Sequence, residues 1–197
     1  MKVVLASNNR NKLREMKQIL EPLGWEILCQ SDLGLHIEPE ENGSTFEENS
    51  AIKAVAVMEA SGLPAIADDS GIEVDALHGE PGVYSARYGG AACVDDRARN
   101  CLLVKNMETV PDGERQCRFV SVITMAKPDG TKISARGTIE GELLREEVGN
   151  GGFGYDPLFW IPTESCTMAQ LSPERKNEIS HRANALKRFV EMITNEA

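Results

Sequence analysis

Two adjacent carboxylates are the residues of this 197-residue chain best suited to catalysis. Asp68 and Asp69 follow the apolar run 63–67, which predicts a buried strand because it is short and bounded by turn residues. We expect that strand to end at the aspartates, at a sheet rim where open α/β folds bind ligands. Neighbouring carboxylates repel each other, so a proton or a cation must neutralise one, and Mg²⁺ is the usual cation beside a phosphate. The alternative is an Asp-Asp-Ser-Gly surface turn.

A second acidic cluster lies in the loop predicted for residues 31–43. Its Glu41 is expected to join Asp68 or Asp69 around one magnesium ion, and the neighbouring Glu40 could serve instead. A solvated acidic loop is the alternative. Lys53, on the helix that follows, is by itself typical of a surface residue.

A polar loop joins the first predicted strand to the first predicted helix. It consists of Ser7, Asn8, Asn9, Arg10, Asn11 and Lys12. Backbone N–H groups at a helix N-terminus attract phosphate, and a lysine in the first turn opposes the helix dipole unless it has another role. An Asn-rich turn with a solvated lysine explains the segment equally well.

A glycine-rich loop at 149–154 presents two aromatic side chains and one carboxylate. It matches G-x-G-x-x-G, but Tyr155, Asp156 and a proline follow, so no helix opens there and the dinucleotide fingerprint is excluded. Phe153 and Tyr155, which flank Gly154, are expected to stack on a base while Asp156 accepts hydrogen bonds from base N–H groups. A glycine turn with core aromatics is the rival interpretation.

Polar donors gather near the start of the last helical region. Lys176, His181 and Arg182 lie beside an apolar stripe and suggest one wall of an anion or carbonyl pocket, although a lone histidine is more often structural. The sequence shows neither a Ser/His/Asp triad nor a credible cysteine nucleophile, so we do not expect covalent catalysis.

The elements that must position these residues form a mixed α/β pattern with a hairpin insertion that forms a smaller lobe. Strands are predicted at 3–7, 26–29, 63–68, 71–75, 119–126, 131–137 and 157–162. Helices are predicted around 13–20, from 46 to near 62, at 95–107, from 173, and over a final amphipathic stretch around 183–193.

Composition indicates one large domain or a two-lobed unit of an ordinary globular protein, with 41% hydrophobic and 26% charged residues. The net charge of −10 argues against general nucleic-acid binding. Five scattered cysteines without metal spacing predict reduced thiols in a cytoplasmic protein. Neither a signal-peptide pattern nor an apolar stretch of membrane-spanning length is visible.

Four motifs in order resemble the inosine triphosphate pyrophosphatase family, the non-canonical purine NTP pyrophosphatases that clear dITP, ITP and XTP. They are residues 7–12, 67–71, 152–157 and 180–182, and the run Pro81–Tyr88 looks like the bacterial branch. The resemblance spans essentially the whole chain. The family's opening motif usually reads Thr-Gly-Asn-x-x-Lys, and Ser7-Asn8-Asn9 departs from it mildly while leaving Asn9 and Lys12 in register.

The resemblance implies an elongated, two-lobed α/β fold around a central substrate cleft, generally a homodimer. It implies attack of magnesium-activated water on the α-phosphorus, which releases the monophosphate and pyrophosphate. Mapped onto this sequence, Asn9, Lys12, Lys53 and Ser70 hold the triphosphate, Glu41 and Asp69 hold magnesium, and Asp69, with Asp68 assisting, activates water. The base is bound by Phe153, Tyr155 and Asp156, and its 6-oxo edge is read by Lys176, His181 and Arg182. A pyrophosphatase for modified pyrimidines and a non-catalytic nucleotide-binding module are the alternatives.

Overall fold

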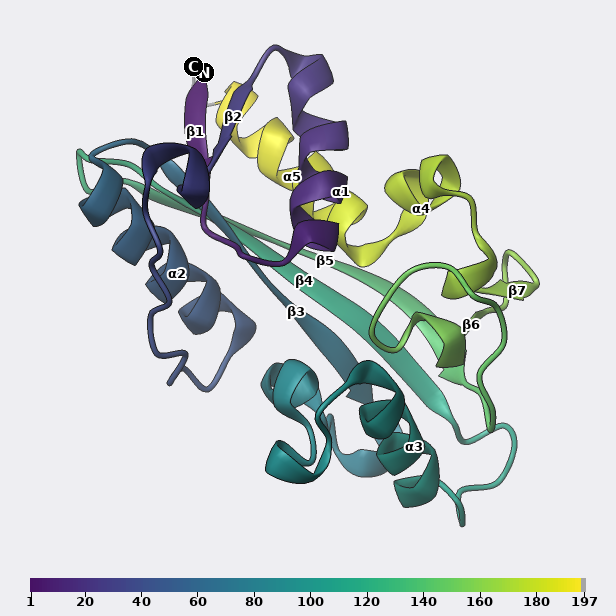
Figure 1. Ribbon diagram of the computed structural model, residues 1–197. Helices are drawn as coiled ribbons and strands as arrows, with labels where there is room; N and C mark the ends of the chain where they lie inside the picture. Colours follow the sequence, from purple (N-terminus) through teal and green to yellow (C-terminus); the bar gives the residue numbers. More distant parts are fainter. Residues whose placement is uncertain (196–197) are drawn as a thin grey trace. The chain divides into compact units, whose positions relative to one another are not determined.

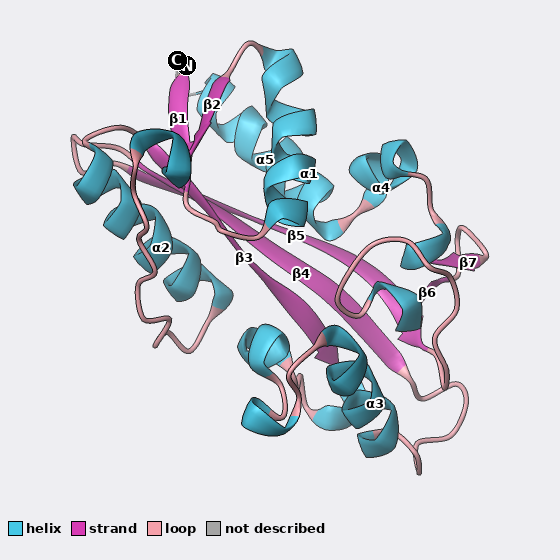
Figure 2. Cartoon of the chain, viewed as in Figure 1, coloured by secondary structure: helices cyan, strands magenta, loops and turns pink. Residues whose placement is uncertain are grey.

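The computed structural model describes residues 1–195 and has a mixed seven-stranded sheet with helices, which confirms the predicted α/β class (Figures 1 and 2). Sheet order is β2-β1-β3-β4-β5-β6-β7. The strands are β1 (Lys2–Leu5), β2 (Glu26–Cys29), β3 (Ala65–Val74), β4 (Gln116–Ala126), β5 (Lys132–Leu143), β6 (Phe159–Ile161) and β7 (Cys166–Thr167). The α-helices are α1 (Arg10–Leu20), α2 (Phe46–Ser61), α3 (Asp96–Asn106), α4 (Pro173–Ile179) and α5 (His181–Asn195).

Two compact units divide the chain, and neither is continuous in sequence. Unit 1 comprises Met1–Ser70, Ser121–Gly137 and the segment from His181 on, and unit 2 comprises Gly71–Val120 and Thr138–Ser180. Strands β3, β4 and β5 therefore each contribute residues to both units. Within unit 1, β1 pairs in parallel with β2 and β3, whereas β6 pairs antiparallel with β5 and β7 in unit 2.

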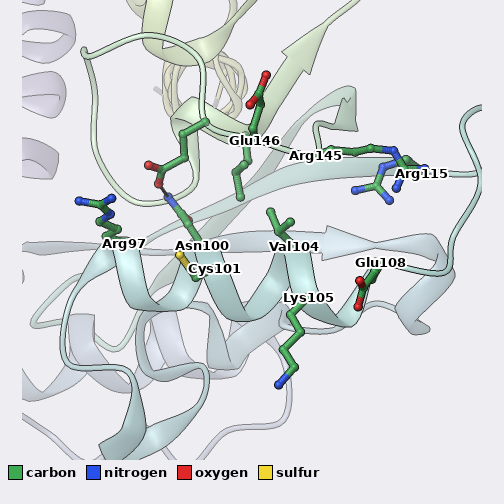
Figure 3. A pocket seen from close by; sticks show the side chains of 11 residues that line it. Arg97, Asn100, Cys101, Val104, Lys105, Glu108, Arg115, Arg145 and Glu146 are labelled. Atoms are coloured by element: carbon green, nitrogen blue, oxygen red, sulfur yellow. Dashed lines mark hydrogen bonds between the residues drawn. The ribbon is translucent and has the colours of Figure 1, made fainter.

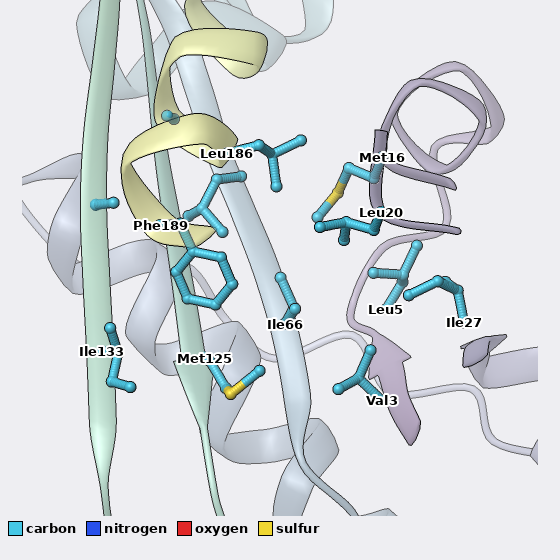
Figure 4. Close-up of a cluster of buried hydrophobic side chains, with 13 residues drawn as sticks. Val3, Leu5, Met16, Leu20, Ile27, Ile66, Met125, Ile133, Leu186 and Phe189 are labelled. Carbon is cyan, nitrogen blue, oxygen red and sulfur yellow. The ribbon is translucent and has the colours of Figure 1, made fainter. Parts of the chain in front are cut away.

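Unit 1 buries both faces of its sheet, as parallel strands covered by helices do. Alternate residues of β1 enter two different clusters: Val3 and Leu5 pack with side chains of α1 and α5, and Val4 packs with side chains of α2. Figure 4 shows the first cluster, in which Phe189 and Leu186 of α5 face residues of the sheet. These two clusters fix α1, α2 and α5 on the strands that carry the candidate site.

Unit 2 is organised around its own apolar cluster. Ile72 and Val74 of β3 pack with Leu103 and Met107 of α3, together with residues of β4, β5 and β6. Phe119 and Phe159 stack at 4.4 Å between ring centroids. This cluster holds the glycine-rich loop through Tyr155 and Leu158, which are both buried.

One strand replaces the two predicted around the aspartates, so the prediction that a strand ends at Asp68 is wrong. β3 runs unbroken from Ala65 to Val74. β1 pairs with it only as far as Ile66, so the aspartates lie in β3 beyond the carboxyl end of β1 rather than at the end of their own strand. Gly71, whose type suggested a turn, is instead a point of close approach: a Cβ there would lie 2.3 Å from Ser85 Oγ.

Several other elements begin or end at residues that differ from the predicted ones. β4 and β5 are longer than predicted, and β6 is shorter because a 3₁₀ turn takes up Asp156–Leu158. The final helical region is broken at Ser180, which ends α4 in extended conformation before α5 begins. Within residues 1–195, each helix is too short or too polar to cross a bilayer.

Candidate active site

The loop between β1 and α1 is fixed by its own side chains. Asn9 is the N-cap of α1, and its Oδ1 accepts hydrogen bonds from the N–H groups of Asn11 (2.9 Å) and Lys12 (3.2 Å). Ser7 Oγ accepts from the Asn9 N–H, and Asn8 donates to Glu38. The first turn of α1 contains no acidic residue, so the positive end of the helix dipole is uncompensated there. The loop is thus built to favour an anion.

Asp68 is the centre of a buried charge cluster in unit 1. Its side chain is fully buried, and Oδ2 lies 2.8 Å from Lys12 Nζ and accepts a hydrogen bond from Arg182 at 3.0 Å. Ser121 of β4 donates to the other carboxylate oxygen. Burial alone would raise the pKa of Asp68, but the charges of Arg182 and Lys12 outweigh it and hold that pKa well below its usual value. The surroundings of Asp68 therefore favour its ionised form.

Arg182 contacts two carboxylates rather than an open surface. Its side chain is 1% exposed and donates to Glu15 of α1, to Asp68 and to Ser70 Oγ (3.1 Å). Burial alone would lower the pKa of Arg182, but Asp68 and Glu15 reverse that effect and raise it. The arginine that the sequence suggested as a reader of the base is thus held by the charge cluster of unit 1.

Asp69 faces a different partner from Asp68. Its Oδ1 lies 2.7 Å from Lys53 Nζ, and the same Nζ lies 3.1 Å from Glu41 Oε2. Burial raises the pKa of Asp69, and the neighbouring Lys53 cancels only part of this rise. Asp69 Oδ2 is buried and accepts no hydrogen bond within the described chain. The two neighbouring aspartates thus differ. Both carboxylate oxygens of Asp68 contact cations or hydrogen-bond donors, whereas Oδ2 of Asp69 has no hydrogen-bond partner in the described chain.

The loop that carries Glu41 is attached to α2. Gly43 donates its N–H to Oδ1 of the fully buried Asn49 at 2.9 Å, and Ser44 donates to the Glu48 carboxylate. Thr45 is the N-cap of α2, and its hydroxyl oxygen accepts a hydrogen bond from the Glu48 N–H at 3.1 Å. Glu41 makes the contact to Lys53, whereas Glu40 is exposed.

Glu41 and Asp69 fit a divalent cation chemically, because both offer carboxylate oxygens and Asp69 Oδ2 is an orphaned buried acceptor. Among residues 1–195 no group of three His, Cys, Asp or Glu side chains converges as a ready-made metal cage. A magnesium ion does not need such a cage, since it keeps several waters and shares its remaining positions with phosphate.

Unit 2 contains the glycine loop and its lysine. Asp156 Oδ2 accepts hydrogen bonds from the Phe153 N–H (2.9 Å) and from Lys176 Nζ (2.7 Å), and Nζ lies 4.7 Å from the centroid of the Phe153 ring. Gly152 has a φ of 72°, and a Cβ there would lie 2.0 Å from Asp156 Oδ2. The carboxylate thus sits directly under the loop, in a space that only glycine leaves open.

Tyr155 takes a structural place in this loop. Its ring belongs to the buried cluster of unit 2, and its hydroxyl donates to the backbone oxygen of Ser85 at 2.8 Å. Burial raises the pKa of this hydroxyl. Gly154 donates its N–H to Asp96 and accepts from Asn100. The interpretation of core aromatics below a glycine turn therefore holds for Tyr155, while Phe153 is half-buried.

The residues of the predicted wall of donors belong to two different units, with the boundary after Ser180. Lys176 is part of unit 2, where it donates to Asp156, and Arg182 is part of unit 1, where it donates to Asp68. His181 is buried at the first residue of α5.

A model of the Ham1 family matches residues 3–192. This chain belongs to the Ham1 family. A dITP/XTP pyrophosphatase of Thermus thermophilus is 51% identical to it over 191 residues, 97% of this chain and 91% of the relative. A dITP/XTP pyrophosphatase of Desulforamulus reducens is 48% identical over 98% of this chain and 96% of its own. The Staphylococcus aureus Ham1 protein superimposes with a TM-score of 0.88 at 41% identity, and each chain is covered completely. These matches confirm the family resemblance seen in the motifs.

Three further residues of this Ham1 family member contact the candidate site and escaped sequence analysis. Glu15 balances Arg182, Ser121 holds Asp68, and Asn49 holds the loop of Glu41. Glu15 gave a weak signal, because it follows Lys12 by three residues and so shares its helix face. Ser121 and Asn49 gave no signal, because a single serine or asparagine does not indicate which group of the folded chain it will contact.

A pocket of about 560 Å³ lies elsewhere in this Ham1 family member, within unit 2 (Figure 3). Side chains of α3 and of the segment after β5 line it, including Asn100, Val104, Arg145 and Glu146. None of the site residues predicted from the sequence lines this pocket. Its position therefore adds nothing to the candidate site.

Proposed function

We propose that this chain hydrolyses the non-canonical purine nucleoside triphosphates dITP, ITP and XTP to the monophosphate and pyrophosphate. One observation carries the proposal: Asp68 is paired with cations while the adjacent Asp69 keeps a buried oxygen without a hydrogen-bond partner in the described chain. The chain is also 51% identical to a dITP/XTP pyrophosphatase. A protein that only binds nucleotides gains little from an open buried carboxylate beside a triphosphate.

Magnesium is the proposed cofactor, held by Glu41 and Asp69. When bound, it would lower the pKa of a coordinated water and offset negative charge on the phosphates. The open Oδ2 of Asp69 makes this residue the proposed acceptor of the water's proton, for attack on the α-phosphorus. Asp68 is proposed to act indirectly: it is fixed as an anion and orients Lys12.

The triphosphate is proposed to bind at the N-terminus of α1, with Lys12, Lys53 and Ser70 as side-chain donors and Asn9 as the residue that shapes the loop. In unit 2, Phe153 is proposed to stack on the base, with Lys176 donating to its 6-oxo group and Asp156 holding both residues. An adenine amino group would leave that donor unpaired, at a cost of roughly 1–3 kcal/mol. His181 remains a candidate for the same edge, and Arg182 is proposed to act through Asp68.

Release of pyrophosphate by the purified protein tests the function, with magnesium and with dITP, XTP, dATP, dGTP, dCTP and dTTP in parallel. We expect strong preference for dITP and XTP. Preference for dCTP or dTTP would leave the proposed metal site standing and overturn the base assignment. Absence of release from every nucleotide would favour a binding module.

Two matched variants locate the chemistry. Asp69→Asn is expected to abolish release without loss of the fold, and Glu41→Gln to weaken activation by magnesium. Glu40→Gln is the control, because this neighbouring carboxylate is exposed. An active Asp69→Asn, or equal effects at Glu40 and Glu41, would contradict the assigned roles.

We further propose a homodimer and a cytoplasmic location for this chain. The dimer is inferred from the resemblance to the family, and the location is supported by five cysteines that form no disulfide. Light scattering during gel filtration tests the first proposal, and fractionation of the source cells tests the second.

A further inference from the structure

Lys53 lies between the two proposed metal ligands. Its Nζ is 2.7 Å from Asp69 Oδ1 and 3.1 Å from Glu41 Oε2. The side chains of Lys53 and Asp69 are only 13% and 9% exposed, so water screens their charges only in part. The ammonium therefore fills the gap on which the two carboxylates converge.

A divalent cation and this ammonium compete for the same gap. Mg²⁺ binds carboxylate oxygens at about 2.0–2.1 Å, so an ion bound between Glu41 Oε2 and Asp69 Oδ1 would compete with Lys53 Nζ for the same volume. Two cations held within about 4 Å of each other in partly buried surroundings repel strongly. For a metal ion to bind between these two oxygens, the ammonium must leave.

Lys53 can leave without disturbing its helix. Its charge lies at the end of a flexible four-carbon stem, and α2 is fixed one turn earlier by the buried Asn49 and Ser50. Ser50 Oγ contacts the backbone oxygens of Ala67 and Val122, which ties α2 to β3 and β4. The anchored backbone and the mobile tip together allow one lysine to occupy two positions.

We propose that Lys53 is the internal counter-ion of the metal site, a positioning residue that holds the carboxylates of Glu41 and Asp69 together while no nucleotide is bound. It is displaced to the triphosphate when a magnesium–nucleotide complex arrives, a step that rests on the proposed function. Without the ammonium, the two carboxylates would repel each other. The lysine therefore makes the bare site a poor binder of free metal and couples metal entry to nucleotide entry.

The test measures Mn²⁺ binding to the nucleotide-free protein, by electron paramagnetic resonance of the free ion. Lys53→Gln is expected to bind Mn²⁺ about tenfold more tightly than the wild type, because it removes the competing charge. Lys12→Gln is the matched control: it makes the same charge change on a lysine that contacts Asp68 instead, and we expect a gain of less than about threefold. Unchanged or weaker binding by Lys53→Gln, or an equal gain in Lys12→Gln, would overturn the proposal.

Two more variants keep the test decisive. Lys53→Met replaces Lys53→Gln if the latter does not fold by circular dichroism, with the same expected gain. Lys53→Arg retains a cation and is expected to bind Mn²⁺ as weakly as the wild type, so tight binding by this variant would also count against the proposal. Because no nucleotide is present, the outcome is independent of which triphosphate is hydrolysed, and the pyrophosphate assay can fail or succeed separately.

Discussion

Replacing Arg182 by methionine should cost this protein a large part of its stability. The guanidinium is 1% exposed and serves both Glu15 and Asp68. Its removal leaves Asp68 with Lys12 but leaves Glu15 without this cation, and loss of one partner from a buried pair costs about 3–5 kcal/mol. For a chain of this length, that corresponds to a fall in Tm of roughly 6–20 °C.

A double-mutant cycle isolates the part of this loss that belongs to the ion pair. Glu15→Gln alone keeps Asp68 beside Arg182 and should cost about 1–3 kcal/mol. The double variant no longer buries the Glu15 charge, so we expect it to be more stable than the sum of single effects predicts, with a coupling energy of about 1–3 kcal/mol.

Urea unfolding followed by Trp25 fluorescence measures these energies. Trp25 contacts Phe189 in unit 1, and a Trp160→Phe background leaves it as the chain's single tryptophan. The pair of Lys2 and Glu26, which is 3.1 Å apart and largely exposed, provides a control cycle with an expected coupling below about 1 kcal/mol. Additive effects of Glu15→Gln and Arg182→Met would show that the two side chains do not stabilise the fold as a pair.

Two further predictions concern unit 2. Gly152→Ala should displace the Asp156 carboxylate and raise KM for dITP about tenfold, because the new Cβ would lie 2.0 Å from Oδ2. Gly154→Ala is the control, because a Cβ at that position meets no atom within 4 Å. Equal KM values in both variants would show that backbone strain alone is responsible. Burial raises the pKa of Cys117, so an aromatic disulfide reagent at pH 8 should modify the exposed Cys101 and spare Cys117 in the native protein; peptide mass mapping checks this, and equal labelling would contradict it.

Local sequence signals predicted several elements of this fold correctly. The helices predicted around 13–20 and from 173 depend on residues within one or two turns, and both form, as α1 and α4. The carboxylates and lysines proposed for the site could be named from the sequence because they lie in or near short motifs that occur in the order of the family.

Partners that meet across the fold could not be read in this way. Arg182 and Glu15 are 167 positions apart, and neither residue type signals the other. The continuity of β3 was also hidden, because Gly71 and Ser70 suggest a turn while the neighbouring strand and the close approach of Ser85 favour extended backbone. Burial also distinguishes the two aromatics of the glycine loop: Tyr155 is buried, whereas Phe153 is half-buried and is the one proposed to stack.

The discontinuity of unit 1 has a consequence for biosynthesis. A ribosome makes Glu15 and Asp68 early, but the segment that supplies Arg182 is the last of the three that build this unit. Until that segment emerges, the nascent chain cannot bury both carboxylates without a large desolvation cost. Unit 1 can therefore complete its folding only when α5 docks, and a chain that ends before α5 should be degraded early by proteases.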